Sequence, residues 1–236
     1  MKQEKIFLDY IPDRFKQRVK RFLDAGVNRF MRGKLKKFYS QFFSAGDLVF
    51  DIGAHLGYIS DIFRRLDAKV ISLEPDPRTF KDLEEKFSGM DNVMVVNKGA
   101  SAKDGEMLFY LNEFFPMNST FSPDFKEESR YSFRRWEEAI KVPVTTLDTL
   151  IKTHGTPSFV KIDVEGYELP VIEGLHSPVP YMTYEFHEEF LEDTRKAAMH
   201  LATLSDIEFN LCLEFGGKFI LDDWVDIDTL FNEIEE

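Results

Sequence analysis

The chain has 236 residues, of which 43% are hydrophobic, and 24 of them are phenylalanine. This length suits one large domain, or one domain with a small appendage, and the apolar content is sufficient for a packed core, so global disorder is excluded. The single cysteine, Cys212, cannot form an internal disulfide, and no spacing of Cys and His predicts a structural metal site.

Charge is distributed unevenly along the chain. Residues 1–40 contain twelve Lys and Arg against four Asp and Glu, whereas the remainder carries a balance of −20, which gives the formal net charge of −12. An acidic body repels phosphate backbones, so we expect no nucleic-acid substrate. The sequence has no apolar run of signal-peptide or membrane-spanning length, and a cytoplasmic protein is therefore expected.

We expect residues 1–45 to form a basic helical extension. Residues 12–43 have apolar side chains at helical spacing with Lys and Arg opposite, and the helix is expected in two pieces, broken near Gly26 or Gly33. The simplest interpretation is a helix packed on the domain with a solvated basic face. The alternative is contact of residues 1–40 with an anionic membrane surface or an acidic partner.

From residue 46 onward, strands and helices are predicted to alternate. The segments LVFDIG, AKVISLEPD and NVMVVNKGA have the pattern of buried strands, and helices are expected from about Tyr58 and after Asp76. Asp76 is a suitable N-cap, and Pro77 suits the first helical position. Strands and helices with short connections are typical of a parallel sheet that is covered on both faces.

The middle of the chain departs from this alternation. Two further strands are predicted at GEMLFYLNE and IKVPVTTLD, on either side of a long irregular segment at about residues 113–140. A loop of this length inside a compact domain is usually functional or disordered. The segment combines many aromatic side chains with arginines, which is too aromatic for simple disorder, so we interpret it as a partly ordered lid.

The alternation then resumes to the end of the chain. A strand at PSFVKIDVEG, a short helix at YELPVIEGL, a strand at PYMTYEFHEE and a helix at LEDTRKAAMHLATL are predicted. The segments IEFNLCLE and KFILDDWV are expected to form a hairpin around Gly216 and Gly217. The predicted fold class of residues 46–236 is therefore α/β, with a doubly wound, mostly parallel, seven-stranded Rossmann-like sheet and a C-terminal antiparallel hairpin.

The run LVFDIGAHLGYIS contains the first candidate ligand site. An apolar strand ends at Asp51, and Gly53 and Gly57 open the next helix, whose first N–H groups can bind an anion. Further on, Glu74 ends the second strand, where an acid can accept hydrogen bonds from ribose hydroxyls. Nicotinamide dinucleotides and S-adenosylmethionine both use this geometry. The dinucleotide fingerprint G-x-G-x-x-G lacks its first glycine here, which favours S-adenosylmethionine, with Asp51 facing its ammonium group.

The segments VFDIGAHLGYIS, LEPDPRTFKDL, VPVTTLDTLI, FVKIDVEGYELPVIEG and YEFHEEF resemble the successive motifs of the FkbM family of S-adenosylmethionine-dependent methyltransferases. The resemblance covers about residues 46–190. It implies a class I methyltransferase fold and O-methylation of a hydroxyl on a sugar, glycan or natural product. The implied cofactor contacts are Asp51, Gly53, Gly57 and Glu74, and His55 stands where relatives often have Asn. We also expect His55, Pro75, Ser101 and Asp163 to contact the cofactor.

Four titratable side chains end two neighbouring core strands. Asp163 and Glu165 share one face, as do Glu185 and His187, and ligands lie beyond the carboxyl ends of parallel strands. A sugar hydroxyl needs a base, and His187 is the first candidate because imidazole titrates near neutral pH. Asp163 and Glu165 are the other catalytic candidates. The same cluster suits Mg²⁺ as an alternative, although no metal is included in the favoured interpretation.

Two other functions are compatible with parts of the sequence. A catalytically inactive protein that binds S-adenosylmethionine would keep the cofactor residues, but it has no need of the acids at the strand ends. An NAD(P)-dependent oxidoreductase is disfavoured by the spacing of the glycines. The acceptor is expected to be a small molecule or a glycan that is chosen by the lid.

Overall fold

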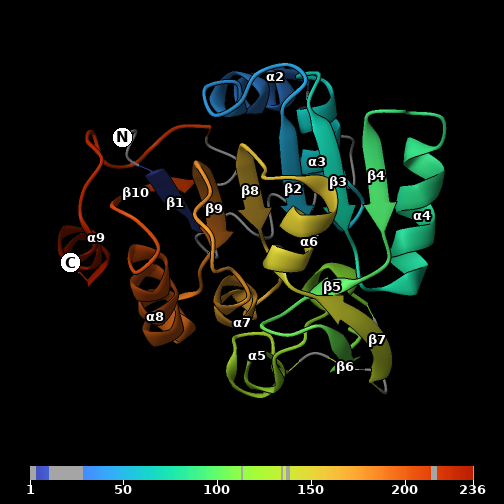
Figure 1. Ribbon diagram of the computed structural model, residues 1–236. Coiled ribbons are helices and arrows are strands. Elements are labelled where there is room, and N and C mark those ends of the chain that lie inside the picture. The colour runs from blue at the N-terminus through green and yellow to red at the C-terminus, as the bar shows by residue number, and fades with distance from the viewer. Residues whose placement is uncertain are drawn as a thin grey trace.

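The computed structural model describes residues 4–10, 29–112, 114–133, 135–136, 139–213 and 217–235. Its central feature is a seven-stranded sheet with the order β10-β1-β9-β8-β2-β3-β4, in which every neighbouring pair is parallel (Figure 1). The strands are β1 (Glu4–Tyr10), β2 (Leu48–Ile52), β3 (Lys69–Leu73), β4 (Val93–Val96), β8 (Phe159–Ile162), β9 (Tyr181–Glu185) and β10 (Ile207–Leu213). The predicted doubly wound α/β fold is confirmed.

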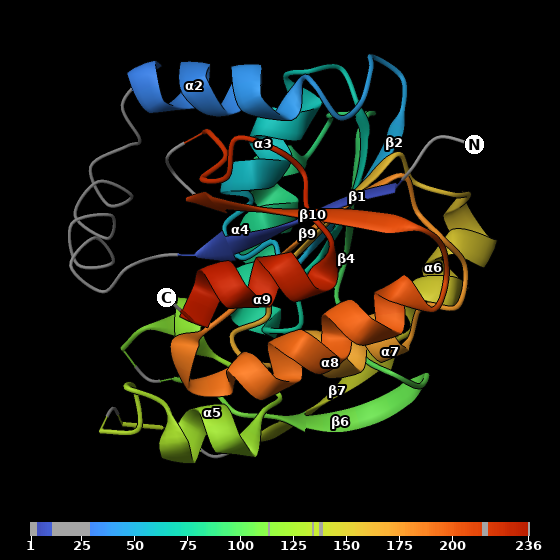
Figure 2. The same cartoon turned by 90° about the vertical axis from the view of Figure 1, so that its left-hand side faces the viewer.

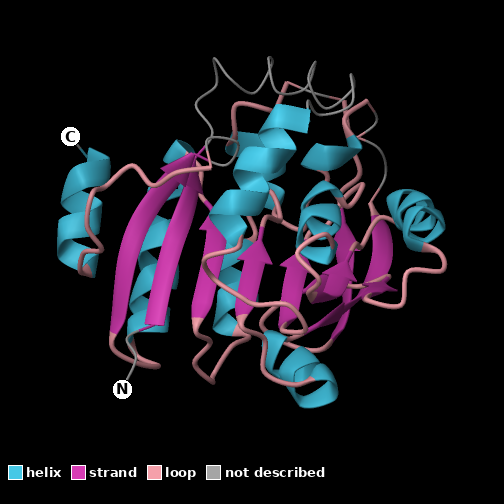
Figure 3. Ribbon diagram, turned by 90° about the horizontal axis from the view of Figure 1, so that it is seen from above, coloured by secondary structure: helices cyan, strands magenta, loops and turns pink. Residues whose placement is uncertain are grey.

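Helices cover both faces of this sheet, as Figure 3 shows from above. One face carries α2 (Arg29–Tyr39), α3 (Tyr58–Arg64) and α4 (Pro77–Phe87), and the other carries α6 (Leu147–His154), α7 (Glu168–Glu173), α8 (Leu191–Ala202) and α9 (Ile227–Glu235). Because side chains alternate along a strand, Val49 of β2 packs with α2 and α3 while Phe50 and Ile52 pack with the second layer. A strand covered on both faces is mostly apolar, and in β2 the exception is the buried Asp51.

A second, three-stranded sheet lies beyond the carboxyl ends of the central strands, below their arrowheads in Figure 1. It has the order β5-β7-β6 and consists of β5 (Gly99–Ala100), β6 (Gly105–Phe109) and β7 (Ile140–Thr145). The two predicted strands around the lid are confirmed, but they pair with each other outside the central sheet. The predicted lid contains the 3-10 helix η1 (Pro116–Asn118) and α5 (Pro123–Glu128) in its described part.

Strand β1 corrects the expected division of the chain at residue 45. It lies between β9 and β10, where Ile6 is the register partner of both Met182 and Phe209 (Figure 2). Residues 4–10 therefore belong to the central sheet and not to a separate helical extension. Charge and helical periodicity are local properties of the sequence, and neither of them indicates a pairing between residues about two hundred positions apart.

The expected helix at residues 12–43 is confirmed only in its last part. Helix α2 runs through Gly33 without a break, and residues 12–28, with the alternative break near Gly26, lie outside the described residues. The apolar side of α2 is buried on the domain through Leu35, Phe38 and Tyr39. Among the described residues, no helix has the length and apolar character that a membrane span requires.

The expected C-terminal hairpin is reduced to two isolated antiparallel bridges, Cys212 with Phe219 and Phe209 with Val225. Residues 217–225 form no strand, and α9 follows them. The side chain of Asn210 donates to the carbonyl oxygens of Leu221 and Asp223 and accepts from the Leu221 N–H. This side chain satisfies backbone groups that a regular ladder would pair, which explains the interruption.

Candidate active site

The first part of the site is the loop between β2 and α3, at residues 53–57. Gly53, His55 and Gly57 all have left-handed backbone, with φ angles of 78°, 47° and 65°. A Cβ atom on Gly53 would collide with the carbonyl oxygen of Asp163 at the end of β8. Gly53 is therefore required because two strand ends pack closely at this position. This is a second reason for a glycine, besides the close approach of a ligand that the sequence predicts.

Glu74 follows β3 and faces this loop. Its carboxylate is buried and accepts hydrogen bonds from the backbone N–H groups of His55 at 2.8 Å and Asp76 at 2.9 Å. Burial raises the pKa of Glu74 to about 7, and the two backbone donors oppose that rise. A carboxylate has about four acceptor sites, so Glu74 can still accept bonds from a ribose diol. Asp76 caps α4 and Pro77 begins it, as predicted.

His55 takes part through its backbone N–H, which is the group that holds Glu74. Burial lowers the pKa of its imidazole to about 4, and the positive charge of Lys161 adds to the effect. The ring is therefore neutral at physiological pH. Pro75 stands between the two acids, and its carbonyl oxygen accepts a hydrogen bond from the side-chain amide of Asn97.

Lys161 of β8 links two strand ends, and the sequence analysis missed its role. Its Nζ atom lies 3.0 Å from Asp163 Oδ2 and 3.6 Å from Asp51 Oδ1. Asp51 is fully buried, and its second oxygen accepts a hydrogen bond from Ser60. A lysine inside an apolar strand of a doubly covered sheet is almost never buried without a partner, and this rule was the available signal.

Asp163 lies directly after β8 and keeps 24% of its side chain exposed. Burial raises its pKa to about 6, the charge of Lys161 opposes the rise, and the carboxyl group of Glu185, which hydrogen-bonds Asp163, adds to it. Glu185 and His187 are both buried, with 3.5 Å between Glu185 Oε2 and His187 Nε2. The four strand-end residues predicted from the sequence therefore share one region at the carboxyl ends of β8 and β9.

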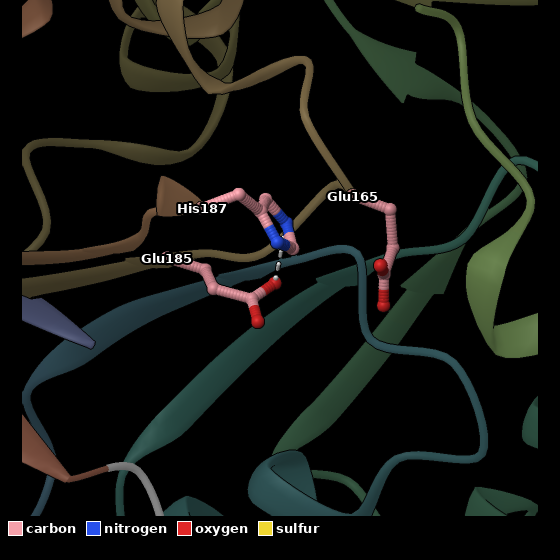
Figure 4. Close-up of side chains that lie close together, drawn as sticks. All are labelled: Glu165, Glu185 and His187. Atoms are coloured by element: carbon pink, nitrogen blue, oxygen red, sulfur yellow. Dashed lines mark ion pairs between the residues drawn. The ribbon is translucent and has the colours of Figure 1, made fainter. Parts of the chain in front are cut away.

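The side chain of Glu165 comes from the loop between β8 and α7 and lies near Glu185 and His187 (Figure 4). One ligand atom from each of Glu165, Glu185 and His187 lies within 4.8 Å of the other two. The lid holds Glu165 from the other side, because Asn118 Nδ2 donates to its Oε2 at 3.0 Å and Thr120 Oγ1 donates to its backbone carbonyl at 2.8 Å. The lid is thus attached to the candidate catalytic residues.

The ring of Phe125 in α5 covers this cluster, with its centroid 5.2 Å from that of His187. Arg130, also in the lid, forms a bidentate ion pair with Glu189 of the 3-10 helix η2 (Glu188–Phe190), with both N–O distances 2.6 Å. Arg130 lowers the pKa of Glu189 to about 2. The lid is therefore joined to the segment that follows β9.

Glu168, the first residue of α7, is a buried acid that the sequence analysis left without a role. Its Oε1 accepts from the N–H groups of Val164 at 3.0 Å and Gly166 at 3.3 Å, so it shapes the loop that carries Glu165. Burial raises its pKa to about 7; nearby His187 opposes the rise. The Oγ atom of Ser101 lies 3.1 Å from the Tyr167 hydroxyl.

The residues around the β2–α3 loop fit S-adenosylmethionine. Glu74 has unused acceptor capacity for a ribose. Asp51 Oδ1 is buried and, within the described part of the chain, has only the long ion pair with Lys161 and no hydrogen-bond donor. An ammonium group would supply that donor. The individual cofactor contacts stay predictions; they are Asp51, Gly53, His55, Gly57, Glu74, Pro75, Ser101 and Asp163.

Comparisons with known proteins give one family match and several solved structures that are similar to the chain. The model of the methyltransferase FkbM domain matches residues 51–210, which is more than half of the chain. No curated protein matches the sequence of this chain. The chain is also similar to a putative rRNA-methylase from Clostridium thermocellum, with 11% identity, a TM-score of 0.39, and coverage of 73% of this chain and 79% of that one.

Two further solved structures are similar at the same low level. A precorrin-6y C5,15-methyltransferase from Geobacter metallireducens GS-15 has 14% identity, a TM-score of 0.35, and coverage of 89% of this chain and 67% of that one. A TehB-like SAM-dependent methyltransferase from Corynebacterium glutamicum has 17% identity, a TM-score of 0.27, and coverage of 36% of this chain; the match spans only 42% of that protein. The domain match includes the cofactor loop and both strand ends, and the chain belongs to the FkbM family of methyltransferases, whose cofactor is S-adenosylmethionine.

Proposed function

We propose that this methyltransferase transfers its methyl group to a hydroxyl of a sugar, a glycan or a natural product. The observation that supports this proposal is the group of carboxylates at the ends of β8 and β9, beside the cofactor loop and under an aromatic lid. S-adenosylmethionine supplies an electrophilic methyl group on a sulfonium. A hydroxyl becomes an effective nucleophile only when its proton is removed, so carboxylates at this place suit O-methylation.

Asp163 is the residue that we propose as the base. Its side chain is 24% exposed, whereas those of Glu185 and His187 are 6% and 3% exposed. Its backbone touches Gly53, so its carboxylate lies next to the cofactor loop. Bound S-adenosylmethionine would supply the methyl group and leave as S-adenosylhomocysteine, and Asp163 would take the proton of the acceptor hydroxyl.

His187, the first candidate from the sequence, is less accessible than Asp163. Its ring packs against Phe125 of the lid and Phe190 of η2, with centroids 5.2 and 6.4 Å away. An acceptor would reach His187 only if these rings moved. We therefore propose that His187 organises the strand end with Glu185, while Asp163 takes the proton.

The lid supplies the surface that we propose for the acceptor. Phe114 and Phe133 are 63% and 83% exposed, and aromatic faces of this kind stack on sugar rings. Positioning the hydroxyl in line with the S–CH₃ bond accounts for much of the acceleration in such a transfer. The ion pair of Arg130 with Glu189 keeps the lid beside the strand ends.

We propose that residues 1–40 contact an anionic surface, and within α2 this contact has to use basic side chains because the apolar side of that helix is buried. Flotation of the protein with anionic liposomes, compared with a chain that lacks residues 11–28, tests this contact. Equal flotation of the two chains would contradict it. Residues 4–10 are kept in both chains because β1 belongs to the sheet.

The proposed acceptor class is tested by incubating the protein and S-adenosylmethionine with a panel of glycans and hydroxylated natural products. Mass spectrometry should detect an increase of one methyl group, and fragmentation should place it on oxygen. Asp163→Asn should lose this activity and retain cofactor binding. Methylation confined to amine, thiol or nucleic-acid acceptors would refute the proposal.

A further inference from the structure

The cluster at the ends of β8 and β9 has the composition of a metal site. We propose that Glu165, Glu185 and His187 bind one divalent metal ion. One ligand atom from each residue lies within 4.8 Å of the other two, and Glu185 Oε2 is 3.5 Å from His187 Nε2. Ligands on adjacent positions of a metal ion at about 2.1 Å lie about 3 Å apart and opposite ligands about 4.2 Å apart, so small side-chain movements would close the site.

The donor set indicates the kind of metal. Two carboxylates and one imidazole combine hard oxygen ligands with a nitrogen ligand that Mn²⁺, Fe²⁺ and Zn²⁺ accept. Calcium prefers oxygen ligands alone, and so do most magnesium sites. The single imidazole therefore favours a transition metal such as Mn²⁺ over the Mg²⁺ that the carboxylates alone would suggest.

Further carboxyl groups surround these three residues. Asp163 lies beside them, 3.0 Å from the ammonium group of Lys161, and Glu168 holds the loop that carries Glu165. Buried carboxylates occur in proteins where they are paired or where they coordinate metals. A divalent cation at Glu165, Glu185 and His187 would bring positive charge to this group of carboxyl groups.

The site is also built from rigid parts. Glu185 is the last residue of β9, and His187 follows it two positions later, on the same side of the chain. Glu165 is oriented by Asn118 from the lid, and its loop is held by the carboxylate of Glu168. Hydrogen bonds of this kind, from neighbours that orient the ligands, are typical of metal sites.

Metal binding would define the acceptor more closely, and this consequence rests on the proposed function. Three protein ligands leave positions on an octahedral ion for oxygens from outside the protein. Two adjacent hydroxyls of a sugar can occupy two such positions. The preferred acceptor would then carry neighbouring oxygens, with one of them presented to Asp163.

The experiment is a titration of the full-length chain, first freed of metals with a chelator, with Mn²⁺ in the absence of cofactor and acceptor. Free Mn²⁺ is followed by electron paramagnetic resonance, and binding of one ion per chain with a micromolar dissociation constant is expected. Glu165→Gln and Glu185→Gln should each weaken binding at least about tenfold. Glu173→Gln, an exposed carboxylate on α7, is the matched control and should leave binding unchanged.

Circular dichroism and the affinity for S-adenosylhomocysteine show whether each variant is folded, and the stoichiometry of the unaltered protein needs no variant. No binding of Mn²⁺, Zn²⁺ or Mg²⁺ at millimolar concentration would overturn the metal site. Unchanged affinity in both folded variants would overturn it equally. Because the titration contains no acceptor, its result is independent of methyl transfer. A bound metal without hydroxyl methylation would refute only the proposed function. Hydroxyl methylation that is insensitive to a chelator would refute the role of the metal in holding the acceptor.

Discussion

Replacement of Lys161 by methionine tests the ion pairs that join the strand ends. The Nζ atom lies 3.0 Å from Asp163 and 3.6 Å from Asp51, and the side chain is only 5% exposed. At an effective dielectric constant of about 20, Coulomb's law assigns about 5.5 and about 4.6 kcal/mol to these attractions. The variant no longer has to bury an ammonium group, and the desolvation cost that it avoids offsets several kcal/mol of the lost attraction. A net destabilisation of about 3–5 kcal/mol is therefore expected.

Urea unfolding followed by circular dichroism measures this loss. With a slope of about 3 kcal/mol per molar urea, the midpoint of Lys161→Met should fall by about 1–1.7 M. The matched control is Lys196→Met on α8, because Lys196 is 53% exposed and pairs with Glu192 and Asp193 at the surface. An exposed pair of this kind contributes less than about 1 kcal/mol, so the control should unfold close to the unaltered protein.

A second substitution makes the test specific. Asp163→Asn in the Lys161→Met background removes one carboxylate that has lost its partner, and it should restore part of the stability. If Lys161→Met unfolds at the same urea concentration as the unaltered protein, or if Asp163→Asn restores nothing, the assignment of these ion pairs to the stability of the site is refuted.

Three further outcomes are expected. Because burial raises the pKa of Glu74 to about 7, cofactor affinity should weaken as the pH falls from 8 to 6 and the carboxylate gains a proton. The Glu74→Gln variant should bind the cofactor weakly at every pH. Calorimetry that finds a constant affinity would contradict the role of Glu74 in cofactor binding. Arg130→Gln should raise KM for the acceptor and change the free energy of unfolding by less than about 1 kcal/mol, measured by initial rates and urea unfolding; an unchanged KM would separate the lid from acceptor binding. Asp163→Asn should lower kcat about 10²–10⁴-fold with a much smaller effect on the cofactor Kd, and full activity would assign the role of base to another residue.

The residues at the strand ends were predictable because short segments of the sequence indicate where each strand ends. Carboxyl ends of parallel strands meet at one edge, so the placement of Asp163 and Glu165 beside Glu185 and His187 follows from the strand pattern alone. The cap at Asp76 follows from turn chemistry in the same way. Such features need only a few neighbouring residues to be recognised.

Other features depend on contacts that no short window contains. Lys161 is held by Asp51, more than a hundred positions earlier, and Glu168 serves a loop whose conformation appears only in three dimensions. The lid has buried and exposed aromatic residues side by side in sequence, so composition could not say which of them cover the site. The pairing of β1 was hidden for the same reason.

The position of β1 has a consequence for how the chain reaches its native state. Lys5 pairs in register with Tyr181, so β1 must remain unpaired until β9 has left the ribosome. At about 5–20 residues per second, this wait lasts roughly 9–35 s. During that time β1 is a strand with open edges, which are sites for pairing with other chains. A chain that begins at residue 46 would leave the edge of β9 without β1, and we expect it to aggregate although it contains the whole region matched by the family.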